Sequence, residues 1–212
     1  MNEPMRFPAA VCILLAGCSS APHFFPTLQE QVISLRKGDL ESAAIAFITP
    51  STVTGQEQEK QAVALTFADV MKAERPALKV VTLAETLGAV NKAGLADDYR
   101  HMYEHYGDTG LFPGVVLRRI ATAAGARYLA QLKLQGFSQG AKNRFGIFGL
   151  RLVETQYADV RLFLQVWDSR DGSIAWEAMQ ELRIAMDSTS NEPVMLRELL
   201  ERSARDLVAR LP

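Results

Sequence analysis

The sequence predicts an α/β (α+β) domain in which helices pack against a mixed β-sheet. Three observations support this prediction. First, short apolar runs end at turn residues, as buried strands do. Second, several segments repeat apolar residues at helical spacing. Third, three later segments alternate apolar and polar residues, as half-buried strands do. The expected order of elements is βαβααβββα. A length of 212 residues with 48% hydrophobic and 22% charged side chains suits one such domain.

The first half of the chain supplies strands and helices in alternation. Helices are expected over residues 27–37, 56–74, 82–94, 96–106 and 113–124, and strands over residues 43–48 and 78–83. Thr82 and Glu85 have the spacing of a capping box at the start of the third helix. Gly125 is placed to end the fifth helix in a left-handed conformation.

The second half supplies three strands and a last helix. Alternation of apolar and polar residues predicts strands over residues 128–134, 160–166 and 174–186. Residues 167–173 (WDSRDGS) are rich in turn formers, so we expect the last two strands to form an antiparallel hairpin. A terminal helix opens at Pro193 and carries a leucine face as far as Leu211.

The N-terminal residues have the features of a secretion signal. Arg6 precedes an apolar stretch over residues 7–16, and Leu15-Ala16-Gly17-Cys18 follows. This arrangement resembles a bacterial lipoprotein signal, whether translation starts at Met1 or Met5. The resemblance implies that the Cys18 thiol carries a diacylglycerol, with further acylation such as palmitate, and that Ser19 after it directs the protein to the outer membrane. We therefore expect a signal peptide over residues 1–17, a lipidated tether over 18–26, and a single periplasmic domain over 27–212.

Composition argues against several classes of function. The chain has 23 basic and 24 acidic side chains, a net charge of −1, so it lacks the excess of positive charge that nucleic-acid binding requires. No phosphate-binding glycine loop and no nucleophile motif occur, so we expect no cofactor and no enzymatic activity. Cys12 leaves with the signal and Cys18 is acylated, which leaves no thiol for a disulfide or a thiolate metal site.

One motif nevertheless matches a catalytic pattern. His101, Glu104 and His105 form H-x-x-E-H, in which two histidines one helical turn apart can bind zinc in a hydrolase. On a helical projection, however, all three point away from the apolar face. We expect an exposed helix face without metal, and the metallohydrolase is the minor alternative. Asp168 and Asp171 similarly fit a hairpin turn better than a calcium loop.

Two further features are candidates for partner contacts. Residues 137–156 join two strands and contain an apolar run with Phe145, Ile147, Phe148 and Leu150, interrupted by glycines and flanked by basic residues. This segment forms either an arm that contacts lipid or another subunit, or one more strand that covers the sheet edge. Trp167 and Trp176 flank the predicted hairpin, where they form either a recognition edge or part of the core.

The order of these elements resembles a known superfamily. The chain resembles outer-membrane lipoproteins of the CsgG and TolB N-terminal-like superfamily. Four segments carry the resemblance: the lipoprotein signal, the strand AAIAFITPS, the strand GARYLAQLKLQGF, and the hairpin VRLFLQVWDSRDGSIAW with its closing helix. The resemblance implies a fold that serves curli secretion, Pel polysaccharide export and activation of peptidoglycan synthases. It therefore implies a non-enzymatic accessory that binds periplasmic proteins in envelope assembly, export or cell-wall synthesis.

An alternative within the same resemblance is a homo-oligomeric ring or channel subunit of a secretion system. A curli-type pore inserts two hairpins per subunit, whereas this chain has one candidate run, which is only about the nine residues that a membrane strand requires.

Overall fold

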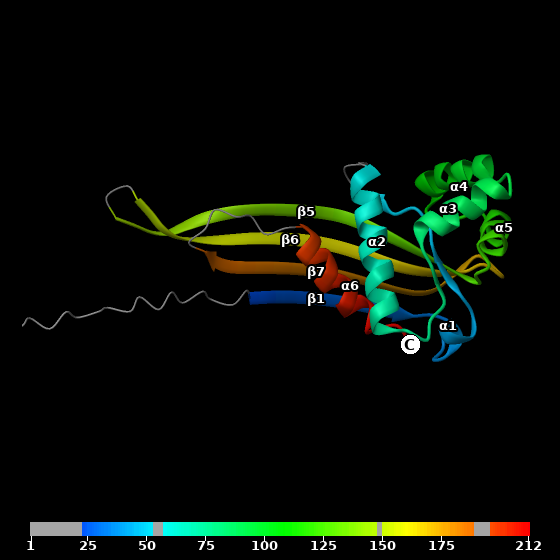
Figure 1. Cartoon of the computed structure of the whole chain (residues 1–212), viewed down its shortest axis with the longest axis horizontal. Coiled ribbons are helices and arrows are strands. Elements are labelled where there is room, and N and C mark those ends of the chain that lie inside the picture. Colours follow the sequence, from blue (N-terminus) through cyan, green and yellow to red (C-terminus); the bar gives the residue numbers. More distant parts are fainter. Residues whose placement is uncertain (1–22, 53–56, 148–149, 189–195) are drawn as a thin grey trace, which may run out of the picture.

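One mixed sheet organises the molecule, and the computed structural model describes it over residues 23–52, 57–147, 150–188 and 196–212. The strands are β1 (His23–Val32), β2 (Ile45–Phe47), β3 (Ser51–Thr52), β4 (Val80–Val81), β5 (Tyr128–Ile147), β6 (Leu150–Asp168) and β7 (Ser173–Ser188). The helices are α1 (Asp39–Ser42), α2 (Glu57–Glu74), α3 (Leu83–Lys92), α4 (Ala96–Thr109), α5 (Gly114–Ala124) and α6 (Leu196–Val208). The strand order is β1-β7-β6-β5-β2-β4, with β3 beside β5 (Figure 1).

The sheet is antiparallel on one side and parallel on the other. β1, β7, β6 and β5 pair antiparallel in that order, whereas β2 pairs parallel to both β5 and β4. The predicted α+β class with helices on a mixed sheet is therefore confirmed. The described part of the chain also contains β1, α1 and β3, which the predicted order lacks. The three helices expected over residues 82–94, 96–106 and 113–124 are present as α3, α4 and α5, although the order βαβααβββα counts only two helices there.

Helices cover both faces of the sheet at one end, which we call the body. On one face, α2 and α6 bury a large core that includes Phe67, Leu207 and Trp176. On the other face, α3, α4 and α5 bury a second core that includes Met102 and Trp167. Alternate residues of β2 point into the two cores, which explains why this short strand is apolar at every position.

Local sequence signals at the body behave as predicted. The Thr82 hydroxyl accepts a hydrogen bond from the Glu85 amide, and the Glu85 carboxylate accepts one from the Thr82 amide at 2.7 Å, which confirms the capping box at the start of α3. Gly125 ends α5 with a φ of 65°, in the left-handed region that favours glycine. The β6–β7 hairpin is also as predicted.

The prediction of a helix over residues 27–37 is wrong. Residues from His23 to Val32 form β1 and pair with β7 along their whole length. Pairing with β7 outweighs the weak helical preference of residues 27–32. The sheet therefore begins inside the segment expected to be a tether.

The remaining strands extend much further than the predicted segments. β5, β6 and β7 are 20, 19 and 16 residues long, and they continue beyond the helices as a narrow ribbon (Figure 1). Residues 137–156 are thus the outer halves of β5 and β6, so the alternative of an additional strand covering the sheet edge is wrong. Within the ribbon, the Tyr157 ring packs directly over Gly140, where a Cβ atom would lie 2.4 Å from the Tyr157 hydroxyl.

Candidate functional site

The start of β1 lies at the end of the sheet that points away from the body. His23 is paired with Ala185 of β7, Ala185 with Tyr157 of β6, and Tyr157 with Gly140 of β5. These four residues form the outermost row in which all four strands of the ribbon are paired. The polypeptide therefore enters the sheet on the side of the β5–β6 hairpin. α3, α4 and α5 lie at the opposite end, whereas α6 reaches the start of β1, where Arg202 lies over the Phe24 ring (Figure 1).

The β5–β6 hairpin extends beyond that row, and we call residues 141–153 the arm. β7 accompanies it as far as the row of Asn143, Glu154 and Ser188. Beyond this row two strands continue alone until Ile147 pairs with Leu150. Register shifts at residues 143–146 mark bulges, which increase the local twist of such a ribbon.

The predicted contact residues of this segment fall within the arm. Phe145 pairs with Val153, and Ile147 pairs with Leu150. Phe148 lies outside the described residues. The structure therefore brings three of the four apolar candidates to the end of the molecule where β1 begins.

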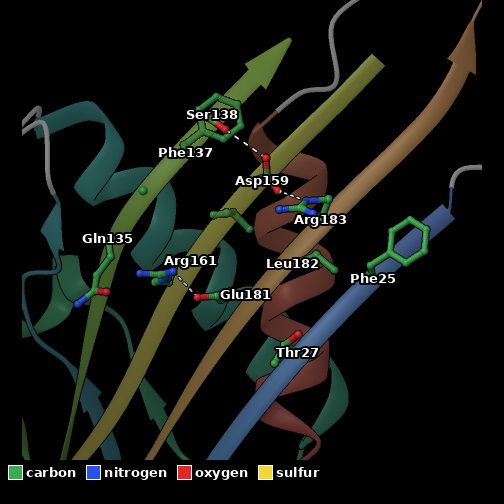
Figure 2. Close-up of a pocket in the computed structure, with 12 residues that line it drawn as sticks. Phe25, Thr27, Gln135, Phe137, Ser138, Asp159, Arg161, Glu181, Leu182 and Arg183 are labelled. Carbon is green, nitrogen blue, oxygen red and sulfur yellow. Dashed lines mark hydrogen bonds and ion pairs between the residues drawn. The ribbon is translucent and has the colours of Figure 1, made fainter. Parts of the chain in front are cut away.

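A shallow hollow of about 460 Å³ lies on the open face of the ribbon (Figure 2). Asp159 accepts hydrogen bonds from Arg183 at 2.6 Å and from the Ser138 hydroxyl at 3.2 Å. Arg161 pairs with Glu181 two rows nearer the body. The Asp159 hydrogen bond raises the pKa of Arg183. Each of these charges has an opposite partner, so the hollow offers a polar, electrically balanced surface.

The two tryptophans are core residues. Trp167 is 1% exposed and packs edge-on against Phe112 in the second core, with ring centroids 5.0 Å apart. Trp176 is fully buried on the opposite face of the sheet, and its indole N–H donates to Glu30 of β1. Of the two alternatives for these tryptophans, core packing therefore holds and the recognition edge does not, because both faces of the sheet are covered at this end.

The H-x-x-E-H residues lie on an exposed face of α4. His101 and Glu104 have side chains that are 62% and 55% exposed, and the His101 ring nitrogen lies 3.9 Å from the carboxylate. Nδ1 of His105 lies 2.9 Å from the carbonyl oxygen of Leu111. This nitrogen is therefore engaged in a hydrogen bond with the loop after α4. Within the described residues, His, Cys, Asp and Glu side chains form no group of three that could hold a metal ion.

Asp168 belongs to the hairpin turn and is committed to two arginines. Its carboxylate accepts hydrogen bonds from Arg127 at 2.7 Å and from Arg170 at 2.9 Å, and its side chain is 5% exposed. Burial raises the pKa of Asp168, but these hydrogen bonds outweigh it and lower the pKa to about 2. Asp171 accepts from the amide and hydroxyl of Ser173. The turn interpretation explains both carboxylates without calcium.

The sequence gives no signal for a tyrosine network between α4 and the loop after β2. The Tyr103 hydroxyl donates to the Thr49 carbonyl at 2.6 Å, and Tyr99 accepts from the Thr49 amide at 2.8 Å. Burial raises the pKa of both tyrosines. These bonds satisfy the backbone where the chain leaves β2, so the network is structural.

The exposed phenylalanines of β1 also escape the sequence analysis. Phe24 and Phe25 are 37% and 57% exposed, and the Arg202 guanidinium lies over the Phe24 ring. Alternation of apolar and polar residues would have indicated a strand here. Residues 23–32 are too polar to show that alternation clearly. Cys18 lies outside the described residues.

Together, fold and site define an elongated α+β domain with a body at one end and a hairpin arm, beside the start of the chain, at the other. Among the described residues, none of the helices has the length and apolarity needed to cross a membrane. No family model matches the chain, and no curated protein matches it.

Solved structures with a similar course of the chain do exist. A PelC dodecamer from Paraburkholderia phytofirmans is 14% identical with a TM-score of 0.44, covering 88% of this chain and 94% of that one. Lipoprotein GNA1162 from Neisseria meningitidis is 14% identical with a TM-score of 0.38, covering 79% and 98%. The LpoB C-terminal domain from Salmonella enterica is 13% identical with a TM-score of 0.37, covering 65% and 81%. At these identities and TM-scores the similarities carry no conclusion about this chain, and the superfamily resemblance stays a prediction.

Proposed function

We propose that this protein is a lipid-anchored accessory of the cell envelope, held at the outer membrane by Cys18, that binds protein partners through its body. One observation carries the proposal. The start of β1 and the arm lie at the same end of the sheet, and the helical body lies at the other. A lipid on Cys18 would therefore bring the arm, and not the body, to the membrane surface.

The lengths of tether and arm support this orientation. His23 lies five positions after Cys18, and an extended chain over five steps reaches at most about 18 Å. On β5, Ile147 lies seven positions after Gly140, which is in the row of His23, and seven steps along a strand span about 23 Å. The arm is therefore at least as long as the tether, so its tip meets the lipid surface when the ribbon stands upright on the membrane.

The composition of the arm suits such a contact. Phe145, Ile147 and Leu150 are apolar, and Lys142 and Arg151 supply positive charge close to them in the sequence. Apolar side chains enter the boundary between headgroups and acyl chains, and basic side chains attract anionic headgroups. The Lys142 side chain is exposed and available for this role.

The body has the features of a binding surface rather than of a catalytic site. Leu111 and Val115 are 59% and 72% exposed near the start of α5, at the end away from the arm. The histidines of the H-x-x-E-H motif are exposed and engaged in local contacts. These observations support binding of a periplasmic protein as the activity of the body.

Fractionation and vesicle binding test the proposal. The full chain should sediment with membranes, and C18S should release most of it into the soluble fraction. The C18S protein should still float with vesicles that contain anionic lipid, because the arm remains, and I147E should reduce the floating fraction several-fold. L111E, a matched change at the body, should leave flotation unchanged. Loss of flotation in L111E but not in I147E would contradict the proposed orientation.

A ring or channel subunit is the second candidate. It is favoured because, among the described residues, no strand lies outside β1 or beside β5 beyond Leu134. This function requires the arm to cross the lipid. Beyond the row shared with β7, however, β5 continues by only four residues, against about nine for a membrane-crossing strand. A cysteine at Ile147 distinguishes the two: a channel makes it reactive from the far side of the vesicle membrane, and a peripheral arm does not.

A further inference from the structure

Both long edges of the ribbon are open. β1 pairs with β7 on one side, and the described residues place no strand on its other side. β5 pairs with β2 and β3 only as far as Leu134, so from Gln135 to Ile147 its outer edge is also without a described neighbour. These two edges lie at the same level of the ribbon, because Thr27 shares a row with Gly136.

Such edges are unusual for a protein that remains monomeric. Nine of the ten residues of β1 are exposed, including one phenylalanine on each face of the strand. Open edges present unpaired N–H and C=O groups that recruit further strands, and proteins protect them with prolines, charges or covering segments. Pro26 is the only proline in β1 or in the described part of β5. A strand added outside β1 would give both phenylalanines a cross-strand neighbour.

We propose that the occupant of these edges is a second copy of this chain, with β1 of one copy pairing antiparallel to the outer half of β5 of the next. Strand direction supports this choice. β5 runs from the body toward the arm, and β1 runs from the arm end toward the body. Two copies standing side by side in the same orientation therefore present antiparallel edges to each other, which continues the pattern of the ribbon.

The alternative pairings fit less well, and here the inference rests on the proposed function. Antiparallel pairing of β1 with β1, or of β5 with β5, points the two arms in opposite directions, which one membrane cannot accommodate. Parallel pairing of two β1 strands keeps the direction but places α2 and α6 of the two copies on opposite faces, and it leaves both β5 edges open. Pairing of β1 with β5 uses both edges through one repeated contact. Repeated head-to-tail contacts close into a ring when the rotation between copies permits.

Cross-linking of the lipidated full chain in membranes tests this pairing. Thr27 on β1 and Ser138 and Lys142 on β5 are exposed, so T27C/S138C and T27C/K142C sample two registers with a short bis-maleimide. Within one copy, β7 and β6 separate these edges by about 14 Å, which excludes an internal link. The controls are the native chain, each single cysteine variant, and K92C/R197C, which places two cysteines at exposed helix positions.

The proposal predicts dimers, trimers and higher species in at least one double variant, and monomer in every control. Dimers from T27C alone would overturn it in favour of β1–β1 pairing, and dimers from a single β5 variant would favour β5–β5 pairing. Monomer in both double variants would also overturn it. Because the samples are isolated membranes, membrane association is measured first: absence from the membrane fraction refutes the proposed function, whereas membrane-bound monomer refutes only the edge pairing.

Discussion

The body and the ribbon are built from the same strands but differ in what covers them. At the body, β5 and β6 have a helical layer on each face, and each layer contributes its own apolar core. Further along the same strands, Asp159 and Arg161 lie on an open face, while Val160 and Leu182 on the other face still belong to the core beside α6, and no described strand lies outside β1. We therefore expect most of the stability to reside in the body, and the proposed contacts with lipid and with neighbouring molecules to involve the ribbon.

Truncation of a large core side chain should show the greatest contrast. W167A removes a ring that is 1% exposed and packed against Phe112, so we expect a loss of about 3–5 kcal/mol in the free energy of unfolding. F25A, in the ribbon, should cost less than about 0.5 kcal/mol. Urea unfolding curves measure both, and equal losses would show that the ribbon is as important for stability as the body.

Ion pairs should show the next largest contrast. The pKa of Asp168 falls from 3.8 to about 2, so its ionised form stabilises the folded state by about 2 kcal/mol. This contribution is complete above pH 4 and disappears as the pH falls toward 2. D168N should therefore lose about 2 kcal/mol at pH 7 and show a weaker acid dependence between pH 4 and 2.

The ribbon offers the matched ion pair. D159N breaks an exposed pair with Arg183 and should cost less than about 1 kcal/mol at any pH. Thermal unfolding midpoints at pH 7, 4 and 2.5 separate the two variants. A parallel pH dependence of D168N and wild type would contradict the assignment of the acid-sensitive step to Asp168.

The capping box gives a smaller effect. T82A removes the hydroxyl that accepts from the Glu85 amide at the start of α3, so we expect a loss of about 1 kcal/mol. T27A, at an exposed position of β1, should change the free energy of unfolding by less than about 0.5 kcal/mol. Urea unfolding resolves the difference, and the opposite ranking would rule out the cap as a stabilising element.

The arm should contribute least to stability and most to lipid contact. I147E changes a position near the end of a two-stranded hairpin, so the free energy of unfolding should move by less than about 0.5 kcal/mol. Vesicle flotation of the C18S protein should nevertheless fall several-fold. Unfolding and flotation measured on one preparation check both parts, and a large loss of stability would place the arm in the folded core.

Sequence reasoning succeeded where burial leaves a pattern. The body helices, the capping box at Thr82 and the β6–β7 hairpin all follow from apolar periodicity and turn chemistry. It failed for β1, because an edge strand with nine exposed residues carries no burial pattern. It also missed the lengths of β5 and β6, since only pairing with a neighbouring strand, and not burial, specifies their outer halves.

The candidate contact residues divide in the same way. Phe145, Ile147 and Leu150, for which the sequence left an arm or an additional strand open, lie in the outer ends of β5 and β6, and their contact with lipid or another subunit stays a prediction. For Trp167 and Trp176 the sequence left a recognition edge and core packing open, because residue type alone does not reveal which face of a strand is covered, and the structure shows core packing. Whether the start of the chain lies at the same end of the sheet as the arm depends on the pairing of β1 with β7, which the sequence does not display.

The orientation of the molecule on the membrane can be measured directly. An environment-sensitive fluorophore would be attached to the lipidated full chain at I147C or at L111C, and the protein would be bound to vesicles containing brominated lipids. The account predicts strong quenching at position 147 and none at position 111. Quenching at position 111 with none at position 147 would show that the body faces the lipid, and it would contradict the central claim.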